Sequence, residues 1–157
     1  MTSGVTLDRV SLLIEVDART TLAGCEETLA KEGLTLGVGE AADPALDFGT
    51  WLARGAPGAR DAWSDPADHL VAGLDVRLVG GERLSIRPAP RRAVGPDLIA
   101  LVVGLEGRFG KVERAWIRVH RRDAPAPATH PLVADRNPPM TDGEGALFDA
   151  IERALRT

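Results

Sequence analysis

The chain has 157 residues, of which 44% are hydrophobic, so it is long and apolar enough for one domain with a buried core. Its 23 acidic residues outnumber the 19 lysines and arginines and leave a formal net charge of -4, which excludes a general electrostatic attraction to nucleic acid or anionic lipid. No apolar stretch is as long as a membrane span, and the N-terminus lacks the basic-then-apolar order of a signal peptide. We therefore expect a cytoplasmic protein that binds neither nucleic acid nor membranes.

Side chains suited to catalysis are few. The single cysteine, Cys25, cannot form an internal disulfide, and its place on the apolar side of a predicted helix indicates a small core residue rather than a nucleophile. The three histidines are widely spaced and match neither a metal-ligand nor a Ser-His-Asp pattern. We predict no catalytic residue and no metal site.

The first part of the chain predicts one strand, one helix and a long irregular stretch. Apolar residues alternate with others over 10–16, which is typical of a strand with one buried face. A helix capped by Thr20 or Thr21 follows, and Gly33 suits its left-handed end. Residues 34–64 are rich in Gly, Ala, Pro and Asp, and within them only FGTWLA predicts a short helical turn.

The middle of the chain predicts a hairpin, a helix and a further strand. Alternation over 70–78 leads to the strand ERLSI through a Gly-Gly dipeptide, which we interpret as a two-residue hairpin turn. Pro96 suits the start of a helix and Gly104 its end, and a strand covers 112–119. The elements together predict an α+β fold with a mixed or antiparallel sheet flanked by short helices.

The end of the chain predicts a helix that packs on another surface. Residues 124–140 carry five prolines and indicate an extended segment. Thr141 and Glu144 then form a capping box. One apolar stripe follows, made of Leu147, Phe148, Ile151 and Leu155. We expect a single domain in three parts: a body over 1–123, the extended segment, and a docking helix over 141–157.

Two further groups of side chains can be interpreted either as purely structural or as part of a binding site. The basic residues of one loop (Arg87, Arg91 and Arg92) and those at the end of a strand (118–122) suit solvated strand ends and loop charges better than a phosphate site. Trp51, Trp63 and Trp116 could stack on a planar ligand, but packing in a core or interface is the better interpretation for each. Neither group defines a site by itself.

The stretch GLEGRFG at 104–110 places three glycines between an apolar run and a strand. Glycine loses much conformational entropy on folding, so such a cluster indicates left-handed backbone or a main chain that closely approaches something else. Either another strand or a ligand would satisfy this pattern. The residues alone leave both explanations open.

Four stretches give the chain a resemblance to a known family. They are SLLIEVDARTTLAGCEETLAKEGLTLG, FGTWLARGAPG, DHLVAGLDVRLVGGERL and VGPDLIALVVGLEGRFGKVERAWIRVH. In their order they resemble the second half of the FAD-binding domain of the vanillyl-alcohol oxidase and p-cresol methylhydroxylase family (PCMH-type), especially its glycolate-oxidase-like members. The likeness spans about residues 10–123 and is densest in the last stretch, so the body reads as a truncated FAD-binding-type domain.

The resemblance implies two groups of cofactor-binding residues. The residues that would line the flavin side are Gly49, Thr50, Gly55 and Gly58. The residues that would line the nucleotide side are Gly107, Gly110, Lys111 and Val112. In the family, the glycines of the second group bring backbone amides close to the adenine and diphosphate.

The chain also departs from the family pattern. Thr50 stands where the family has the second of two glycines, and Arg108 replaces a threonine. The resemblance further implies that the family's first subdomain, with its diphosphate loop, and its substrate cap are absent from this sequence. Half a cradle of amides would not hold a diphosphate, so we expect no cofactor on the chain alone.

Two functional hypotheses follow from the resemblance. In the first, the chain is a degenerate homologue that does no catalysis by itself and works as an interaction or regulatory module, as a homo-oligomer or with a partner protein. In the second, it is the FAD-binding subunit of a split flavin-dependent oxidoreductase whose partner supplies the phosphate loop and substrate cap. FAD would then bind only with the partner present.

Overall fold

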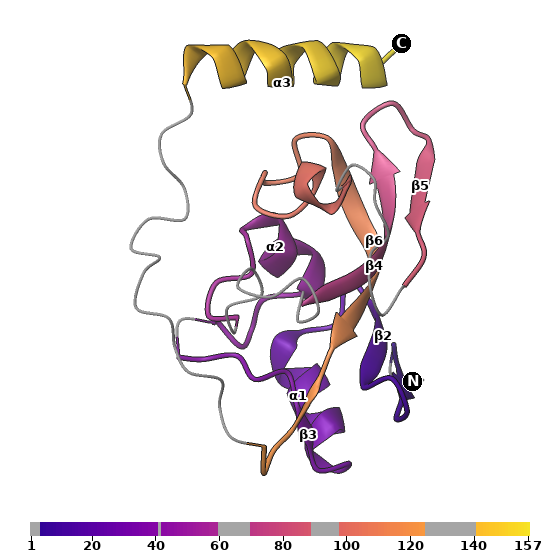
Figure 1. Ribbon diagram of the computed structural model, residues 1–157, viewed down its shortest axis with the longest axis vertical. Helices are drawn as coiled ribbons and strands as arrows, with labels where there is room; N and C mark the ends of the chain where they lie inside the picture. Colours follow the sequence, from indigo (N-terminus) through magenta and orange to yellow (C-terminus); the bar gives the residue numbers. More distant parts are fainter. Residues whose placement is uncertain (1–3, 41, 60–69, 89–97, 125–140) are drawn as a thin grey trace.

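The computed structural model describes residues 4–40, 42–59, 70–88, 98–124 and 141–157 (Figure 1). Five antiparallel strands form one sheet in the order β1-β2-β6-β4-β5. Their bounds are β1 Val5–Asp8, β2 Leu13–Asp17, β4 Val71–Leu78, β5 Arg83–Ile86 and β6 Gly110–Arg118. A second, two-stranded sheet pairs β3 (Leu34–Thr35) with β7 (His120–Arg121). The predicted α+β class with an antiparallel sheet is confirmed.

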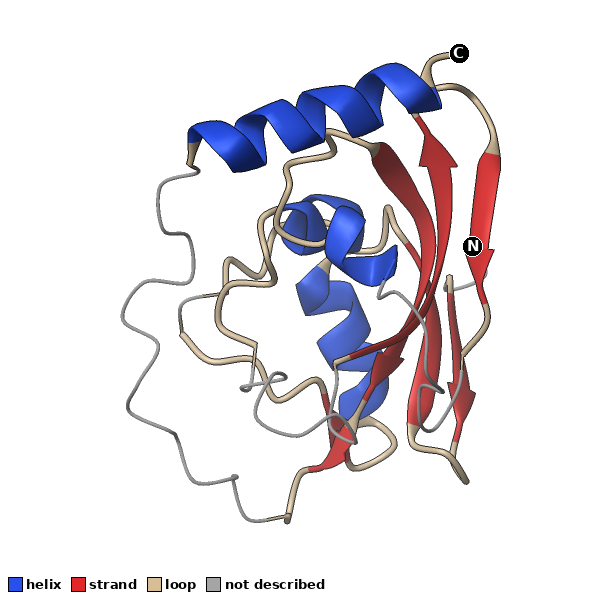
Figure 2. Cartoon of the chain, turned by 45° about the horizontal axis from the view of Figure 1, so that its top comes forward, coloured by secondary structure: helices blue, strands red, loops and turns tan. Residues whose placement is uncertain are grey.

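The helices lie mainly on one face of the large sheet. They are α1 (Leu22–Ala30), α2 (Phe48–Ala53), the 3-10 turn η2 (Leu98–Leu101) and α3 (Asp142–Leu155). In Figure 2, α1 and α2 cover the same side of the strands, whereas α3 runs across one end of the molecule. The body is therefore two layers, with a separate helix laid along one edge of them.

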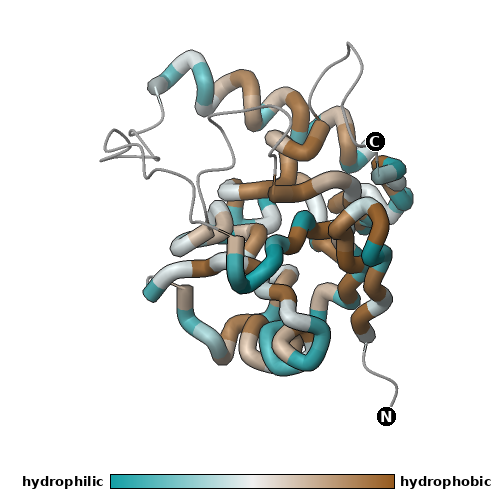
Figure 3. The backbone as a smooth tube through the Cα atoms, turned by 60° about the horizontal axis from the view of Figure 1, so that its bottom comes forward, coloured by the Kyte–Doolittle hydropathy of each residue, from teal (hydrophilic) through white to brown (hydrophobic). Residues whose placement is uncertain are grey.

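The core fills the space between the sheet and α1 and α2. Ile14, Val16 and Ile117 point into it from neighbouring strands and are fully buried. Trp51 of α2 is also fully buried; its indole N–H donates to the Pro57 carbonyl at 2.9 Å, and its ring meets Phe48 edge-on. The packing interpretation of Trp51 is thus confirmed. Figure 3 shows that hydrophobic residues are concentrated along the central elements of the fold.

Helix α1 begins and ends as the sequence predicts. Thr21 is its N-cap, with a side-chain oxygen that accepts from the Gly24 amide at 3.1 Å. Gly33, just beyond the last turn, has a φ of 68°. On the inner side of α1, Glu26 accepts 2.8 Å bonds from the Thr35 hydroxyl and the Leu36 amide, which fixes β3 beside the helix.

The first predicted strand is partly wrong. Residues 9–12 form a turn in which Val10 is 95% exposed and Leu12 has a φ of 51°, so β2 begins only at Leu13. The cause is Asp8, whose carboxylate accepts from the amides of Val10 and Ser11 at 2.9 and 3.1 Å and so stabilises a turn. Strand β1, which precedes this turn and pairs with β2, was not predicted.

The hairpin is confirmed, but its turn is longer than two residues. Arg77 pairs with Arg83, and the Leu78 amide donates to the Glu82 carbonyl at 2.9 Å, which leaves 79–81 as the connection. Gly81 has a φ of 100° there. The predicted helix start at Pro96 lies outside the described residues. In place of the rest of that predicted helix, the chain forms only the short 3-10 turn η2.

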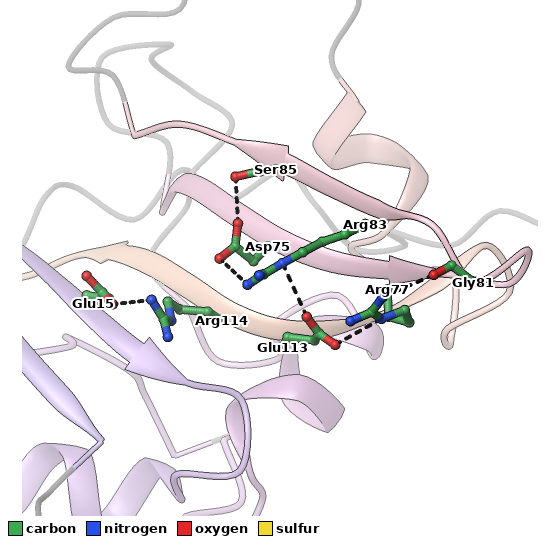
Figure 4. A network of polar contacts seen from close by, with 8 residues as sticks. All are labelled: Glu15, Asp75, Arg77, Gly81, Arg83, Ser85, Glu113 and Arg114. Carbon is green, nitrogen blue, oxygen red and sulfur yellow. Dashed lines mark hydrogen bonds and ion pairs between the residues drawn. The ribbon is translucent and has the colours of Figure 1, made fainter.

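The outer face of the large sheet carries a network of charges (Figure 4). Asp75 of β4 is 6% exposed and accepts from Ser85 at 2.6 Å and from Arg83 at 2.9 Å, both on β5. Arg83 also contacts Glu113 of β6 at 3.4 Å. One guanidinium thus connects three adjacent strands.

Helix α3 begins at the predicted capping box, because the Thr141 and Glu144 side chains each bond to the other's backbone amide. None of its described residues is buried, and Leu147 of the predicted stripe is 57% exposed. Across the described ranges, no helix is long and apolar enough to cross a membrane.

We predict that Glu26→Ala lowers the free energy of unfolding by about 1–3 kcal/mol, because it leaves the Leu36 amide without its acceptor. The matched control is the next residue, Glu27→Ala, an exposed carboxylate 3.4 Å from Lys31, for which we expect a change below about 0.5 kcal/mol. Urea denaturation measures both. Equal losses would show that Glu26 does not hold β3.

Candidate functional site

A cleft of about 520 Å³ lies where α2 meets the segment that follows η2. Its lining comprises Ala18, Arg19, Asp47, Gly49, Thr50, Ala53, Arg54, Val102, Glu106, Gly107, Gly110, Lys111 and Val112. Six of the eight residues that the resemblance implies are therefore brought together here, although they come from α2, the turn before β6 and β6 itself, far apart in the sequence. The volume is within the range of small-ligand sites.

Gly55 and Gly58 do not line this cleft. Gly55 lies beside Gly104, and a Cβ on Gly55 would be at ordinary contact distance, 3.5 Å, from the Gly104 Cα. The Gly58 carbonyl accepts from the Gly39 amide at 2.7 Å and so contacts that residue instead. The structure thus separates these two glycines from the other six residues.

The start of α2 forms one wall of the cleft, and its amides are already engaged. Asp47, the N-cap, accepts from the Thr50 amide at 2.8 Å through its side chain and from the Trp51 amide at 2.9 Å through its carbonyl. The amides of Phe48 and Gly49 donate to the carbonyls of Thr20 and Ala18, each at 2.9 Å. All four amides at this end are satisfied by the chain itself.

Thr50, which stands at a glycine position of the family, points its hydroxyl toward the cap. The Thr50 hydroxyl donates to Asp47 Oδ2 at 2.9 Å, while the Thr50 amide donates to Oδ1 of the same carboxylate. The substitution therefore strengthens the turn that begins α2. It also uses a hydroxyl that a ligand could otherwise bind.

The turn 104–110 forms the opposite wall, and its backbone closes the other end of α2. The amides of Gly104 and Glu106 donate to the carbonyls of Leu52 and Ala53 at 3.0 and 2.9 Å. Gly104 has a φ of 81°, which allows its backbone to lie directly against Gly55. The glycines at this point serve contact between two segments of the chain, which answers the question raised by the sequence.

Gly110, at the start of β6, shows the same use of glycine. A Cβ at this position would lie 2.7 Å from the Arg77 carbonyl oxygen, so a side chain here would push β6 away from β4. The small residue is needed for strand pairing, whatever else enters the cleft.

Charged side chains of both signs surround the opening. Arg54 and Lys111 are exposed cations, and Asp47 and Glu106 are the acidic residues of the lining. Arg19 donates to the Asp17 carboxylate at 3.1 Å, and this hydrogen bond is the main reason why the pKa of Asp17 lies below its usual range. Sequence reasoning did not select Arg19, Asp47 or Arg54, because only the fold brings them beside β6.

An FAD diphosphate would need several converging N–H donors. Three amides of lining residues, those of Gly49, Thr50 and Glu106, donate to acceptors within the chain instead. The carboxylate of Glu106 also faces the cleft and would repel an anion. The three engaged amides are therefore not available to a diphosphate.

Other sources of chemistry are also missing from the described residues. They contain no group of three or more His, Cys, Asp or Glu that could hold a metal ion. Cys25 is fully buried in the core, as predicted, and burial raises the pKa of its thiol to about 12, with a smaller contribution from Glu26. This thiol is therefore protonated at neutral pH and is a poor nucleophile.

Comparison with solved structures defines the class of fold. Alkyldihydroxyacetonephosphate synthase, solved in two crystal forms, matches 73% of this chain with a TM-score of 0.59 in each case, at 21% and 22% sequence identity. The match covers 20% and 22% of the synthase chain. The fold is that of one part of this larger protein.

Comparison with curated sequences gives the relationship. The chain is 26% identical over 96 residues to the uncharacterized FAD-linked oxidoreductase YgcU of Escherichia coli K12, and equally to that of strain O157:H7. The match covers 61% of this chain and 20% of the relative, so the chain spans about a fifth of that protein's length. No protein-family model matches. The resemblance is confirmed: the chain is a homologue of part of a PCMH-type FAD-binding domain.

The buried thiol leads to a prediction about pH. Burial raises the pKa of the Cys25 thiol to about 12 in the folded protein, whereas the unfolded chain releases this proton near the ordinary thiol pKa of 9.0. The stability that depends on the protonated thiol is therefore full below pH 9 and falls as pH rises toward 12. We expect the free energy of unfolding to fall more steeply in the wild type than in Cys25→Ala. Parallel slopes in urea denaturation between pH 8 and 11 would contradict this assignment.

Proposed function

We propose that this chain does no redox chemistry by itself and works as an interaction module, in which the cleft receives part of a protein partner. The observation that carries the proposal is the engagement within the chain of the Gly49, Thr50 and Glu106 amides, because these lining donors would otherwise be natural ligands of a dinucleotide diphosphate. The cleft then offers FAD fewer free donors but keeps a shape that can accept other groups.

The lining supports a protein occupant. Ala18, Ala53 and Val112 offer small apolar surface, while Arg54 and Glu106 offer one charge of each sign near the opening. A combination of apolar floor and mixed charge at the edge is typical of protein interfaces, in which a polar rim surrounds an apolar centre. An interaction or regulatory role agrees with this composition.

A second candidate function is favoured by a different observation. Arg54 and Lys111 are exposed cations at the same cleft that gathers six family positions, and YgcU is named as an FAD-linked oxidoreductase. In this alternative, the chain is one subunit of a split flavin-dependent oxidoreductase, and another polypeptide supplies the missing diphosphate donors. FAD would then be held between the two, with the cations of this chain as secondary contacts.

Titration of the purified chain with FAD by calorimetry separates binding alone from binding with a partner. We expect no binding tighter than about 1 mM, since the wall amides cannot turn toward an added diphosphate without breaking α2 contacts. Micromolar binding would overturn the proposal. It would be assigned to the cleft if Arg54→Glu or Lys111→Glu weakened it and Lys31→Glu, which changes an exposed cation outside the lining, did not.

The split-enzyme alternative has its own measurement. Complexes that the tagged chain forms in its own cells would carry the absorption of oxidised flavin, and the colour would be lost when the partner is removed. Colourless complexes would leave the interaction module as the function of this cleft.

A further inference from the structure

Glu106, which lines the cleft, has a backbone conformation that few glutamates adopt. Its φ is 51°, and the φ of Gly107 is 78°. The Arg108 amide donates to the Leu105 carbonyl at 2.9 Å, which closes the turn around these two residues. Positive φ at both central positions is the mark of a type I′ turn, in which Gly, Asn and Asp are the usual residues. A glutamate at the first central position is therefore held in an unfavourable conformation.

Main-chain contacts impose this conformation on Glu106. Its amide donates at 2.9 Å to the carbonyl of Ala53, the last residue of α2, and Gly104 with a φ of 81° begins the turn. A residue in left-handed backbone persists only where its surroundings determine it, and such residues gather at functional sites. Glycine at position 106 could make the same contacts, since they use only the main chain. The glutamate side chain therefore requires a separate explanation.

Within the described part of the chain, no hydrogen bond or ion pair engages the Glu106 carboxylate, which is exposed at the cleft. The nearest cation in the sequence, Arg108, is engaged by α3 instead. Its guanidinium donates to Asp149, contacts Glu152 at 3.3 Å and lies 5.6 Å from the centre of the Phe148 ring. Packing of α3 thus leaves the Glu106 carboxylate free to bind an external group.

Two cations of the same lining are free in the same sense. Arg54 and Lys111 are exposed, and across the described ranges neither forms an ion pair with Glu106 or with another acid. The other charged residues of the lining, Asp47 and Arg19, already bond to neighbours of their own. The cleft therefore presents one carboxylate and two cations without counterions. An occupant that complements all three carries both a basic and an acidic group.

We propose that Glu106 selects the occupant of the cleft, which is a protein segment with a basic side chain for Glu106 and an acidic one for Arg54 or Lys111. This inference rests on the interaction function proposed above and adds the chemistry of the partner. A segment of the wrong charge would leave Glu106 desolvated without a counterion, which is how paired charges give an interface its specificity. The unfavourable backbone is retained because glycine supplies no carboxylate.

Short peptides test the charge preference. The probes are blocked five-residue peptides that carry one arginine and one aspartate, two aspartates or two arginines among alanines. Amide chemical shifts of residues 104–112, followed by NMR, detect binding at about millimolar concentration. We expect the mixed peptide to bind at least about threefold more tightly than either single-sign peptide, and Glu106→Gln to remove this preference. The matched control is Glu27→Gln, which changes an exposed carboxylate outside the lining and should preserve it.

The possible outcomes separate this inference from the proposed function. Equal binding of the two-aspartate peptide, or a preference that survives Glu106→Gln, would overturn the role of Glu106 and leave the interaction function standing. Failure of every peptide to bind would also overturn the charge selection. Micromolar binding of FAD to the chain alone, in contrast, would overturn the interaction function itself.

A measurement of stability tests the same inference without any ligand. Glu106→Gly should raise the urea midpoint of unfolding, because glycine adopts a positive φ without strain, and should also lose the preference for the mixed peptide. Glu106→Gln keeps a side chain at this position and should unfold like the wild type. A midpoint that glycine does not raise would overturn the argument that an unfavourable backbone is kept for the sake of the carboxylate.

Discussion

The contact between the 104–110 turn and the C-terminal end of α2 organises much of this molecule. The Glu106 amide donates to the Ala53 carbonyl, and the Gly104 amide shares the Leu52 carbonyl with the amide of Gly55, while the positive φ of Gly104 shapes the turn. Glu106 and Gly107 of the turn line the cleft, whereas Arg108 and Phe109 contact α3. The seven residues of this turn thus contact the end of α2, form one wall of the cleft and form the surface on which α3 packs.

The sequence was sufficient where local chemistry decides the structure. The cap at Thr21, the left-handed Gly33, the buried Cys25 and the capping box of Thr141 are each set by residues within one or two turns of a helix. The order of the four family-like stretches likewise predicted the α+β fold. Such features need no knowledge of distant segments.

Prediction failed where the outcome depends on a competing local bond or on distant partners. Alternation over 10–16 suggested a continuous strand, but the Asp8 carboxylate captures two amides and makes a turn first. The glycines of 104–110 were compatible with a close contact to a strand or to a ligand. The sequence could not decide between them, because the actual partner, the end of α2, lies about fifty positions earlier in the chain. Arg19 and Arg54, two of the cations of the cleft lining, were missed for the same reason.

The charged network on the outer face of the sheet also limits how this protein can associate. Arg83 bridges Asp75 and Glu113, and Arg77 contacts Glu113 at 3.1 Å. The charged side chains on that face of the sheet are therefore already paired with one another. A second sheet stacked on that face would desolvate several charged side chains that already have partners and would bury little apolar surface. This network of ion pairs therefore disfavours face-to-face aggregation through the outer surface of the sheet.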